Sequence, residues 1–263
     1  MIAILGAMQE EVRAIAAAVE GGEGGEGGRS VQAGPMRVET GRLAGRAIAV
    51  GFSGWGKVAS ASNTVRLVQA CRTVWGHGPE ALLFVGVAGA LDDRLAVGDI
   101  VVADELWQHD LDASPLFAPM QIPLTDKTSL RADEAWSARL EAAGRGLLAD
   151  GLAGIITPSA LASVGLDASP PRVWRGGIAT GDQFVCDAGT RAAIKRRIPG
   201  ALAVEMEGAA VAQVCADEGV PLAAVRVISD SADAHAPASF ATFVEQVADV
   251  MLVEIVRRAV AVK

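Results

Sequence analysis

Acidic residues stand at or shortly after the ends of apolar, β-branched segments at three places in the chain. Glu10 and Glu11 come after the run IAIL, and Glu205 and Glu207 close the run ALAVEME. Asp230 follows the run AAVRVIS. Open α/β sheets place their ligand sites at the carboxyl ends of strands, so these acids are candidates for one shared site. Each also has an ordinary structural explanation, because an acid in a first helical turn complements the helix dipole and Ser-Asp commonly forms a turn or cap.

Two charged residues lie inside apolar strand patterns, where an unpaired charge is unfavourable. Glu205 stands within ALAVEME and Arg226 within AAVRVIS. A buried carboxylate needs a partner, and a buried arginine needs carboxylate or ligand oxygens for its donors. We therefore expect one polar pocket in which the acids and Arg226 converge. Such a pocket suits acid/base chemistry on a neutral, hydroxyl-rich substrate.

The run GFSGWGKV at residues 51–58 fits the phosphate-loop pattern GxxxxGK, but Val58 stands where a Ser or Thr would hold Mg²⁺. No strand pattern ends in an aspartate placed as a second magnesium ligand, so the run predicts a glycine-rich turn close to a smaller ligand. No GxGxxG turn indicates a nicotinamide cofactor, and no GxSxG elbow indicates a serine hydrolase. We expect no cofactor.

Histidines and cysteines show no metal-ligand spacing. His77, His109 and His235 share no short spacing, and the three cysteines form no CxxC pair, so we expect neither a metal site nor a disulfide. Two interpretations of the run HDLD, from His109 to Asp112, stay open: a loop ordered by its own side chains, or a functional segment.

Strand and helix patterns alternate along the chain, which predicts an α/β fold. Strands are predicted at residues 2–5, 47–50, 81–85, 100–102, 201–206 and 222–228. Helices are predicted at residues 9–19, 57–71, 133–144, 190–197, 208–218 and 239–262, the last with one apolar face toward the sheet. We interpret residues 21–28 as a flexible loop and residues 113–124, with three prolines, as a lid or interface arm. No boundary is visible, so we expect one domain over residues 1–263.

The composition is that of a compact globular protein, with 51% hydrophobic and 21% charged residues among 263. Its formal charge of −8, from 31 acidic and 23 basic residues, disfavours nucleic acid as a partner. The longest nearly unbroken apolar run, residues 81–91, is shorter than the ~18 residues of a membrane span, and the start lacks signal-peptide features. We expect a cytoplasmic protein with no membrane partner.

Eight segments together resemble the nucleoside phosphorylase and nucleosidase superfamily, and within it the 5'-methylthioadenosine/S-adenosylhomocysteine nucleosidases. They are GAMQEEV (6–12), SGWGKV (53–58), GVAGAL (86–91), VGDIVVAD (97–104), QHDLDAS (108–114), TGDQFV (180–185), AVEMEGAAVAQVC (203–215) and RVISDSAD (226–233). The resemblance implies a three-layer α/β/α domain around a mixed, partly barrel-like sheet, and a homodimer with the active site near its interface. It also implies hydrolysis of the N-glycosidic bond of methylthioadenosine, S-adenosylhomocysteine or 5'-deoxyadenosine, which releases adenine.

Carried over by position, the resemblance assigns chemical roles to several residues. Glu11 would activate the attacking water. Asp230, oriented by Ser229, would donate a proton to N7 of adenine as the C1'–N9 bond breaks. Glu207 and the Met206 backbone would hold the ribose hydroxyls.

The resemblance also implies how the rest of the pocket is built. Glu205 and Arg226 would order its polar floor and the water. The other predicted substrate-binding residues are Phe184 against the adenine, Val185 at the adenine edge, Met8, Trp55 and Phe240 around the 5' substituent, and Val87, Ala88 and Gly89 in a glycine-containing loop.

This sequence departs from the nucleosidase pattern at two positions. Val87 stands where the nucleosidases usually carry serine, which removes one hydroxyl near the water and the ribose. Trp55 stands where they commonly carry a small aliphatic residue, so the preference among 5' substituents does not carry over.

Four alternative functions stay open. A phosphorylase on the same fold would need arginines and a hydroxyl around phosphate, whereas Glu11 and Val87 stand in the corresponding loops. A hydrolase of futalosine or its deoxy-amino relative would differ mainly in the 5' pocket, at Trp55. A non-catalytic nucleoside-binding protein would not need both a base and an acid. A phosphate-loop NTPase would show magnesium-dependent nucleotide hydrolysis.

Overall fold

The structure is a computed structural model that describes residues 1–21, 29–166 and 170–261. Its centre is a ten-stranded mixed sheet with the strand order β10-β6-β8-β9-β5-β1-β4-β3-β2, and β7 pairs with β6. The strands are β1 (Ile2–Gly6), β2 (Arg29–Ala33), β3 (Met36–Leu43), β4 (Arg46–Phe52), β5 (Ala81–Ala90), β6 (Ile100–Gln108), β7 (Leu130–Arg131), β8 (Val173–Thr180), β9 (Ala201–Glu205) and β10 (Leu222–Asp230).

Part of the sheet closes on itself. Strand β10 pairs with β6 on one side and with β5 on the other, so β5, β10, β6, β8 and β9 form a ring of five strands. Strands β1, β5 and β10 run parallel, which brings their carboxyl ends to the same edge of the sheet. The expected mixed, partly barrel-like sheet is confirmed.

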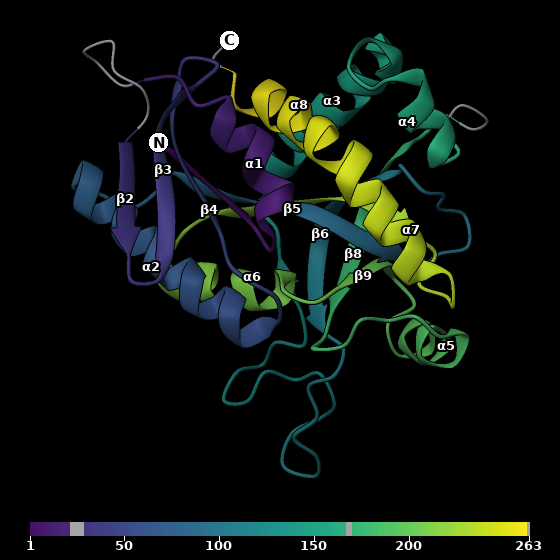
Figure 1. Ribbon diagram of the computed structural model, residues 1–263. Coiled ribbons are helices and arrows are strands. Elements are labelled where there is room, and N and C mark those ends of the chain that lie inside the picture. Colours follow the sequence, from purple (N-terminus) through teal and green to yellow (C-terminus); the bar gives the residue numbers. More distant parts are fainter. Residues whose placement is uncertain (22–28, 167–169, 262–263) are drawn as a thin grey trace.

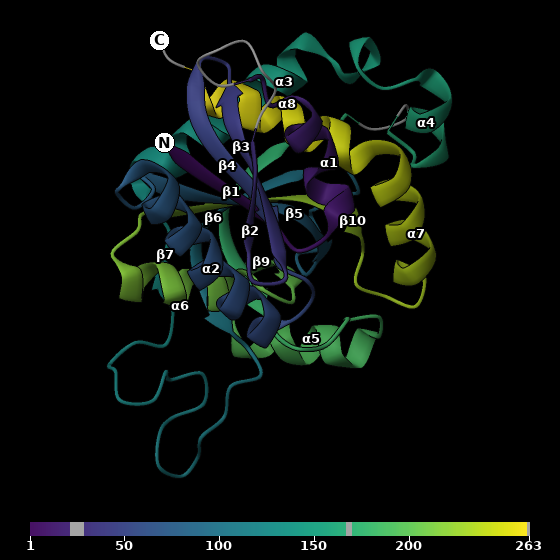
Figure 2. The ribbon, with the colours of Figure 1, turned by 60° about the vertical axis from the view of Figure 1, so that its left-hand side comes forward.

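Helices cover both faces of the sheet (Figures 1 and 2). On one face α8 packs against both α1 and α3, and on the other α2 packs against α6. The helices are α1 (Gln9–Ala17), α2 (Lys57–Trp75), α3 (Glu134–Asp150), α4 (Pro158–Ser163), α5 (Ala188–Arg197), α6 (Gly208–Glu218), α7 (Ala236–Phe243) and α8 (Asp249–Val260).

The alternation of side chains along β1 shows how the three layers are held together. Ile2 and Ile4 belong to the apolar core under α1, α3 and α8, whereas Ala3 and Leu5 belong to the core under α2 and α6. Successive residues of a strand face opposite sides of the sheet, so a strand buried on both faces is apolar throughout. This explains the uninterrupted apolar runs in the sequence.

All six predicted strands and all six predicted helices are present; α6 has the predicted ends, and the others differ at one end or both. Helix α2 continues past Cys71 to Trp75, where Gly76 ends it in the left-handed conformation with φ of 76°. The last predicted helix begins earlier, at Ala236, with a proline in its first turn. A π-helical turn, Val244–Ala248, separates α7 from α8.

Two irregular segments were predicted. Residues 22–28 of the glycine-rich run lie outside the described residues. Residues 113–124 form no helix, as their prolines predict, and belong to the long connection between β6 and β7 that projects from the body of the molecule (Figure 1). Among the helices of the described chain, none is both long and apolar enough to cross a membrane.

Candidate active site

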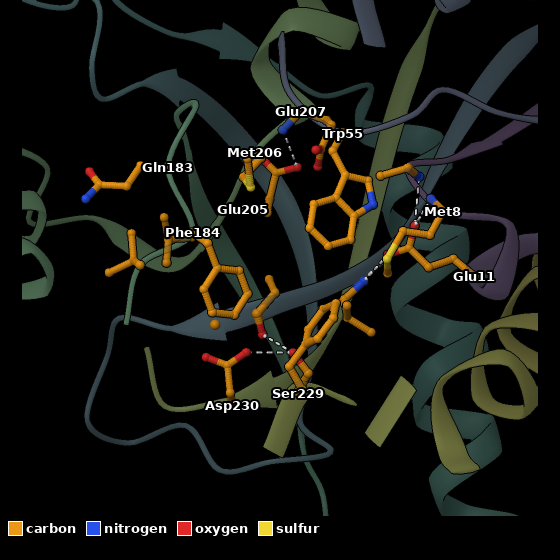
Figure 3. A pocket seen from close by; sticks show the side chains of 17 residues that line it. Met8, Glu11, Trp55, Gln183, Phe184, Glu205, Met206, Glu207, Ser229 and Asp230 are labelled. Atoms are coloured by element: carbon orange, nitrogen blue, oxygen red, sulfur yellow. Dashed lines mark hydrogen bonds between the residues drawn. The ribbon is translucent and has the colours of Figure 1, made fainter. Parts of the chain in front are cut away.

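One cavity lies at the carboxyl ends of β1, β5 and β10, with the β9–α6 turn as a further wall (Figure 3). Except for Arg226, every residue that the sequence predicted for the site lines this cavity. The lining residues are Ala7, Met8, Glu11, Trp55, Val87, Ala88, Gly89, Gln183, Phe184, Val185, Val204, Glu205, Met206, Glu207, Ser229, Asp230 and Phe240.

The lining divides into two parts that we name for use below. The floor consists of Glu11, Glu205, Ser229 and Asp230, each at most 7% exposed. The rim consists of the aromatic residues Trp55, Phe184 and Phe240.

Glu11 enters the floor from the first turn of α1. Its Oε2 accepts hydrogen bonds from the backbone N–H groups of Ala7 and Met8, at 2.7 and 2.9 Å, and its Oε1 accepts one from Val87 at 2.9 Å. Burial raises the pKa of Glu11, although nearby Arg226 and these amides offset part of the rise. Oε1 retains capacity for a further donor such as water.

Gly86 makes this arrangement possible. A Cβ atom at this position would lie 2.4 Å from Oε1 of Glu11 and 3.2 Å from Nη1 of Arg226. Both distances are shorter than ordinary van der Waals contact, so the carboxylate and the guanidinium share space that only glycine leaves open.

Glu205 and Arg226 satisfy each other beneath the cavity. Nη2 of Arg226 lies 2.8 Å from Oε2 of Glu205, and the guanidinium sits over the ring of Phe84 at 4.0 Å. Glu205 also accepts from the backbone N–H groups of Glu207 and Gly208 and from the Thr180 hydroxyl. The carboxylate partner that a buried arginine was expected to need is Glu205.

Arg226 differs from the expectation in its position. It is 2% exposed, and the cavity is lined by Glu205 and Glu11 instead. The reason is its place along β10: Arg226 lies in the middle of the strand, four positions before Asp230, whereas the cavity lies at the carboxyl end of the strand. The guanidinium can therefore act on the site through the two carboxylates.

Asp230 ends β10 at the other side of the floor. Its Oδ2 accepts from the Ser229 hydroxyl at 2.8 Å and its Oδ1 from the backbone N–H of Ala232 at 2.8 Å. Burial raises the pKa of Asp230, while these two donors lower it and the charge of Asp233 raises it further. A carboxyl with a raised pKa keeps its proton to higher pH than an exposed aspartate does.

Glu207 links the floor to the loop that carries Trp55. Its Oε1 accepts from the backbone N–H of Gly56 at 2.7 Å. Burial, together with the neighbouring charge of Glu205, raises the pKa of Glu207 to about 8. The side chain is therefore mostly protonated at neutral pH and can both donate and accept hydrogen bonds.

The rim is a row of aromatic rings in edge-to-face contact. The ring of Phe240 lies 6.3 Å from that of Trp55 and 5.6 Å from that of Phe184, measured between centroids. Beyond Trp55 and Phe240 a surface groove continues from the cavity, and its charged residues are Glu10, Arg13 and Glu245. The rim thus stands between the cavity and an open surface groove. On the cavity side it offers an apolar wall that suits a planar group.

Three lining residues were not predicted: Ala7, Gln183 and Val204. Ala7 and Gln183 lie inside the segments GAMQEEV and TGDQFV, which were singled out for their neighbours. Their residue types are common in loops and carry no chemical signal of their own.

Within the described residues no group of three or more potential ligands could hold a metal ion.

Comparisons with known proteins identify what this chain is similar to. A family profile, the phosphorylase superfamily, matches residues 1–261. The structure resembles 5'-methylthioadenosine/S-adenosylhomocysteine nucleosidase from Neisseria meningitidis in complex with methylthio-immucillin-A, at 27% identity over 99% of this chain and 98% of that chain, with a TM-score of 0.80. It resembles S-adenosylhomocysteine nucleosidase from Streptococcus pyogenes at 29% identity, over 97% and 95% of the two chains, with a TM-score of 0.77. It also resembles futalosine hydrolase of Helicobacter pylori at 30% identity, over 98% and 96%, with a TM-score of 0.77.

Proposed function

The chain belongs to the phosphorylase superfamily, and from this membership we propose that it hydrolyses the N-glycosidic bond of 5'-methylthioadenosine, S-adenosylhomocysteine or both. The products are adenine and a 5-substituted ribose, and 5'-deoxyadenosine is a further candidate substrate. One observation carries the proposal: Glu11 and Asp230, two buried carboxyls with raised pKa values, line the same cavity from separate places.

In the proposed reaction the two carboxyls have complementary roles. Asp230 donates its proton to N7 of the purine while the C1'–N9 bond breaks and its electron pair passes to the base. Water adds to C1', and Glu11 accepts the proton that this water loses. The transition state has oxocarbenium character, so a carboxylate near the sugar stabilises the developing positive charge.

The other lining residues would bind and orient the nucleoside. Glu207 and the Met206 backbone, which line the cavity, would hold ribose hydroxyls. Phe184 would stack on the adenine, and the Val185 backbone would read the polar edge of the base. Met8, Trp55 and Phe240 would surround the 5' substituent. Val87 and its neighbours Ala88 and Gly89 would approach the ribose through backbone atoms.

The charges of the cavity favour water over phosphate as the nucleophile. Neither lysine nor arginine is among the residues that line it in the described chain. Arg226 is committed to Glu205, and Val87 contributes no hydroxyl donor. A phosphate dianion would meet the Glu11 carboxylate without a cation to balance it, which is unfavourable in a buried site.

Futalosine or its deoxy-amino relative is a second candidate substrate. Two observations support it: the similarity to a futalosine hydrolase at 30% identity, and the groove that continues from the cavity past Trp55. A nucleoside with a large 5' substituent could extend into this groove.

We also propose that the protein forms a homodimer. Three large apolar side chains that a second copy could cover support this proposal: Val58 on α2, 82% exposed, and Leu116 and Leu124 on the projecting connection, 83% and 92% exposed. Light scattering of the purified protein should give twice the chain mass.

The proposed function is tested by incubating the protein with methylthioadenosine, with and without phosphate, and identifying both products. We expect adenine and free methylthioribose at equal rates in the two conditions. A phosphate requirement with a sugar 1-phosphate product would identify a phosphorylase instead. S-adenosylhomocysteine and futalosine, assayed in parallel, rank the candidate substrates by kcat/KM.

A further inference from the structure

Two sequence motifs that the proposed reaction does not use meet in the structure. They are the phosphate-loop-like run that ends at Lys57 and the HDLD run that contains Asp110. Nζ of Lys57 lies 2.6 Å from Oδ1 of Asp110. Oδ2 of Asp110 accepts a hydrogen bond from the backbone N–H of Asp182 at 2.9 Å, and Oδ1 of Asp182 accepts one from the backbone N–H of Lys57 at 2.7 Å. We call Lys57, Asp110 and Asp182 the clasp.

The clasp connects the two loops that carry rim residues. Trp55 stands two residues before Lys57, and Phe184 stands two residues after Asp182. The loop before α2 is also tied to the ribose side of the cavity, because Gly56 donates to Glu207. The relative placement of Trp55 and Phe184 therefore depends on these few polar contacts.

The contacts account for the glycine and the lysine of the phosphate-loop-like run. Gly56 has a φ of 87°, and a Cβ there would lie 2.9 Å from Oδ1 of Asp182. The N–H groups of Gly56 and Lys57, which in a phosphate loop would face a ligand, donate to side-chain oxygens of Glu207 and Asp182. The ammonium of Lys57 pairs with Asp110. The run thus binds acidic side chains of this chain in place of a phosphate.

The Asp110 end of the clasp is anchored by His109. The backbone N–H of His109 donates to the Thr180 carbonyl at 2.9 Å, and Arg197 donates to the His109 carbonyl at 2.7 Å. A Cβ on Gly181 would lie 2.2 Å from Nε2 of His109, so the imidazole packs directly under the loop of Phe184. Burial alone would raise the pKa of Asp110, but the Lys57 ammonium and the Asp182 amide lower it overall.

We propose that Lys57 is a positioning residue that acts through the clasp to hold Trp55 and Phe184 at the separation a nucleoside requires. The inference rests on the proposed nucleoside hydrolysis. Glu11 and Asp230 lie on other elements, α1 and β10, so loosening the clasp leaves the reacting groups in place. The loss should therefore appear in substrate binding more than in turnover.

The variants Lys57→Met and Asp110→Asn test the proposal with methylthioadenosine as substrate. We expect KM to rise about 10-fold in each, because a charge-assisted contact that positions a binding loop is lost, with kcat within about twofold of wild type. Lys57→Arg should restore most of the binding. In the double variant KM should rise by less than the product of the two single-variant rises, since both substitutions disrupt the ion pair between Lys57 and Asp110.

Lys195→Met is the matched control, because Lys195 pairs with Asp93 at 2.9 Å and lines no part of the cavity. Its KM should equal that of wild type. An unchanged KM in Lys57→Met, or a kcat that falls as far as kcat/KM, would overturn the proposal.

Hydrogen exchange provides a readout that does not depend on activity. In Lys57→Met the backbone amides of residues 53–57 and 181–185 should exchange faster, with no change in β5. Unchanged exchange in both loops would also overturn the proposal. If the wild-type protein released adenine from none of the nucleosides, the proposed function would fail while this measurement still decided the role of the clasp.

Discussion

The floor and the rim of the cavity are held in place by different forces. Every floor side chain is nearly buried and hydrogen-bonded to the backbone or to a neighbouring side chain. Trp55 of the rim is 56% exposed and lies against another ring, in a loop tied by the clasp. Buried hydrogen bonds at the strand ends and in the first turn of α1 fix the floor, whereas loops, α7 and ring contacts fix the rim. Substitutions in the floor should therefore abolish the reaction, and substitutions in the rim should change which nucleoside reacts.

The largest effect is expected for Asp230→Asn, which removes the proposed acid without changing the shape of the floor. Loss of a general acid typically lowers kcat by about 10²- to 10⁴-fold, with substrate binding retained. Asp217→Asn, the same change on the exposed surface of α6, should leave kcat unaltered. Steady-state adenine release measures both variants, and near-wild-type turnover of Asp230→Asn would exclude the residue as the acid.

The next largest effect is expected for Gly86→Ala, which tests whether the floor depends on space as well as on charge. The new methyl group must displace Oε1 of Glu11, which weakens its hydrogen bond to Val87. We expect kcat to fall on the order of 100-fold, as for other small displacements of a reacting group. Gly146→Ala in α3, where a Cβ meets nothing closer than 3.4 Å, is the control. Equal kcat values in the two variants would contradict the prediction.

Glu207 lies between the floor and the rim, and the variant Glu207→Gln tests how its protonation affects the stability of the fold. The folded protein keeps the Glu207 proton up to a pKa of about 8, whereas the unfolded chain releases it near the ordinary value of about 4.5. The free energy of unfolding should therefore fall as pH rises through this window, and glutamine removes that dependence. We expect Glu207→Gln to be more stable than wild type at pH 8 by on the order of a few kcal/mol, and by less than about 1 kcal/mol at pH 5.

Urea unfolding at pH 5 and pH 8 measures the effect of Glu207→Gln. Glu134→Gln, on the exposed start of α3, is the control and should keep the wild-type dependence on pH. A Glu207→Gln variant that loses stability with pH as steeply as wild type would show that another group dominates, with Glu11 and Asp230 the first candidates because their pKa values are also raised.

The smallest effect is expected for Trp55→Ala in the rim. Removing the indole opens the passage to the groove, so kcat/KM for S-adenosylhomocysteine relative to methylthioadenosine should rise about 5- to 10-fold. Val74→Ala, at the other end of α2 and also exposed, should leave the ratio unchanged. A lower ratio after Trp55→Ala would mean that the indole binds the larger substituent and does not obstruct it.

The floor was easier to predict from sequence than the rim because its residues are unusual where they stand. A glutamate and an arginine inside apolar strands each required a polar partner, and Glu205 and Arg226 pair with each other. Sequence pattern alone did not separate Glu10 from Glu11, and only the resemblance favoured Glu11, which is buried while Glu10 is exposed. The rim aromatics came from the resemblance alone, since large apolar residues are equally common in cores.

The elements that the sequence pattern did not predict were missed for identifiable physical reasons. Strand β8 contains Gly176 and Gly177, and glycines weaken a strand pattern. Gly177 is explained by a residue distant in sequence, because a Cβ atom at position 177 would lie 2.2 Å from the ring of Trp107. Strands β2 and β3 carry many polar residues because they lie at the sheet edge. Helix α3 passes through Gly144, which packs against Ile100 and Val173, so this glycine does not end the helix.

The exposed indole of the rim also makes the protein suited to optical titration. The chain has five tryptophans and no tyrosine, so its ultraviolet emission comes from indoles with no phenolic contribution. Trp136 is buried, and Trp75, Trp107 and Trp174 are half-buried, which leaves Trp55 as the indole most open to a collisional quencher. A nucleoside in the cavity would shield that indole, so iodide quenching reports occupancy directly, without label or turnover.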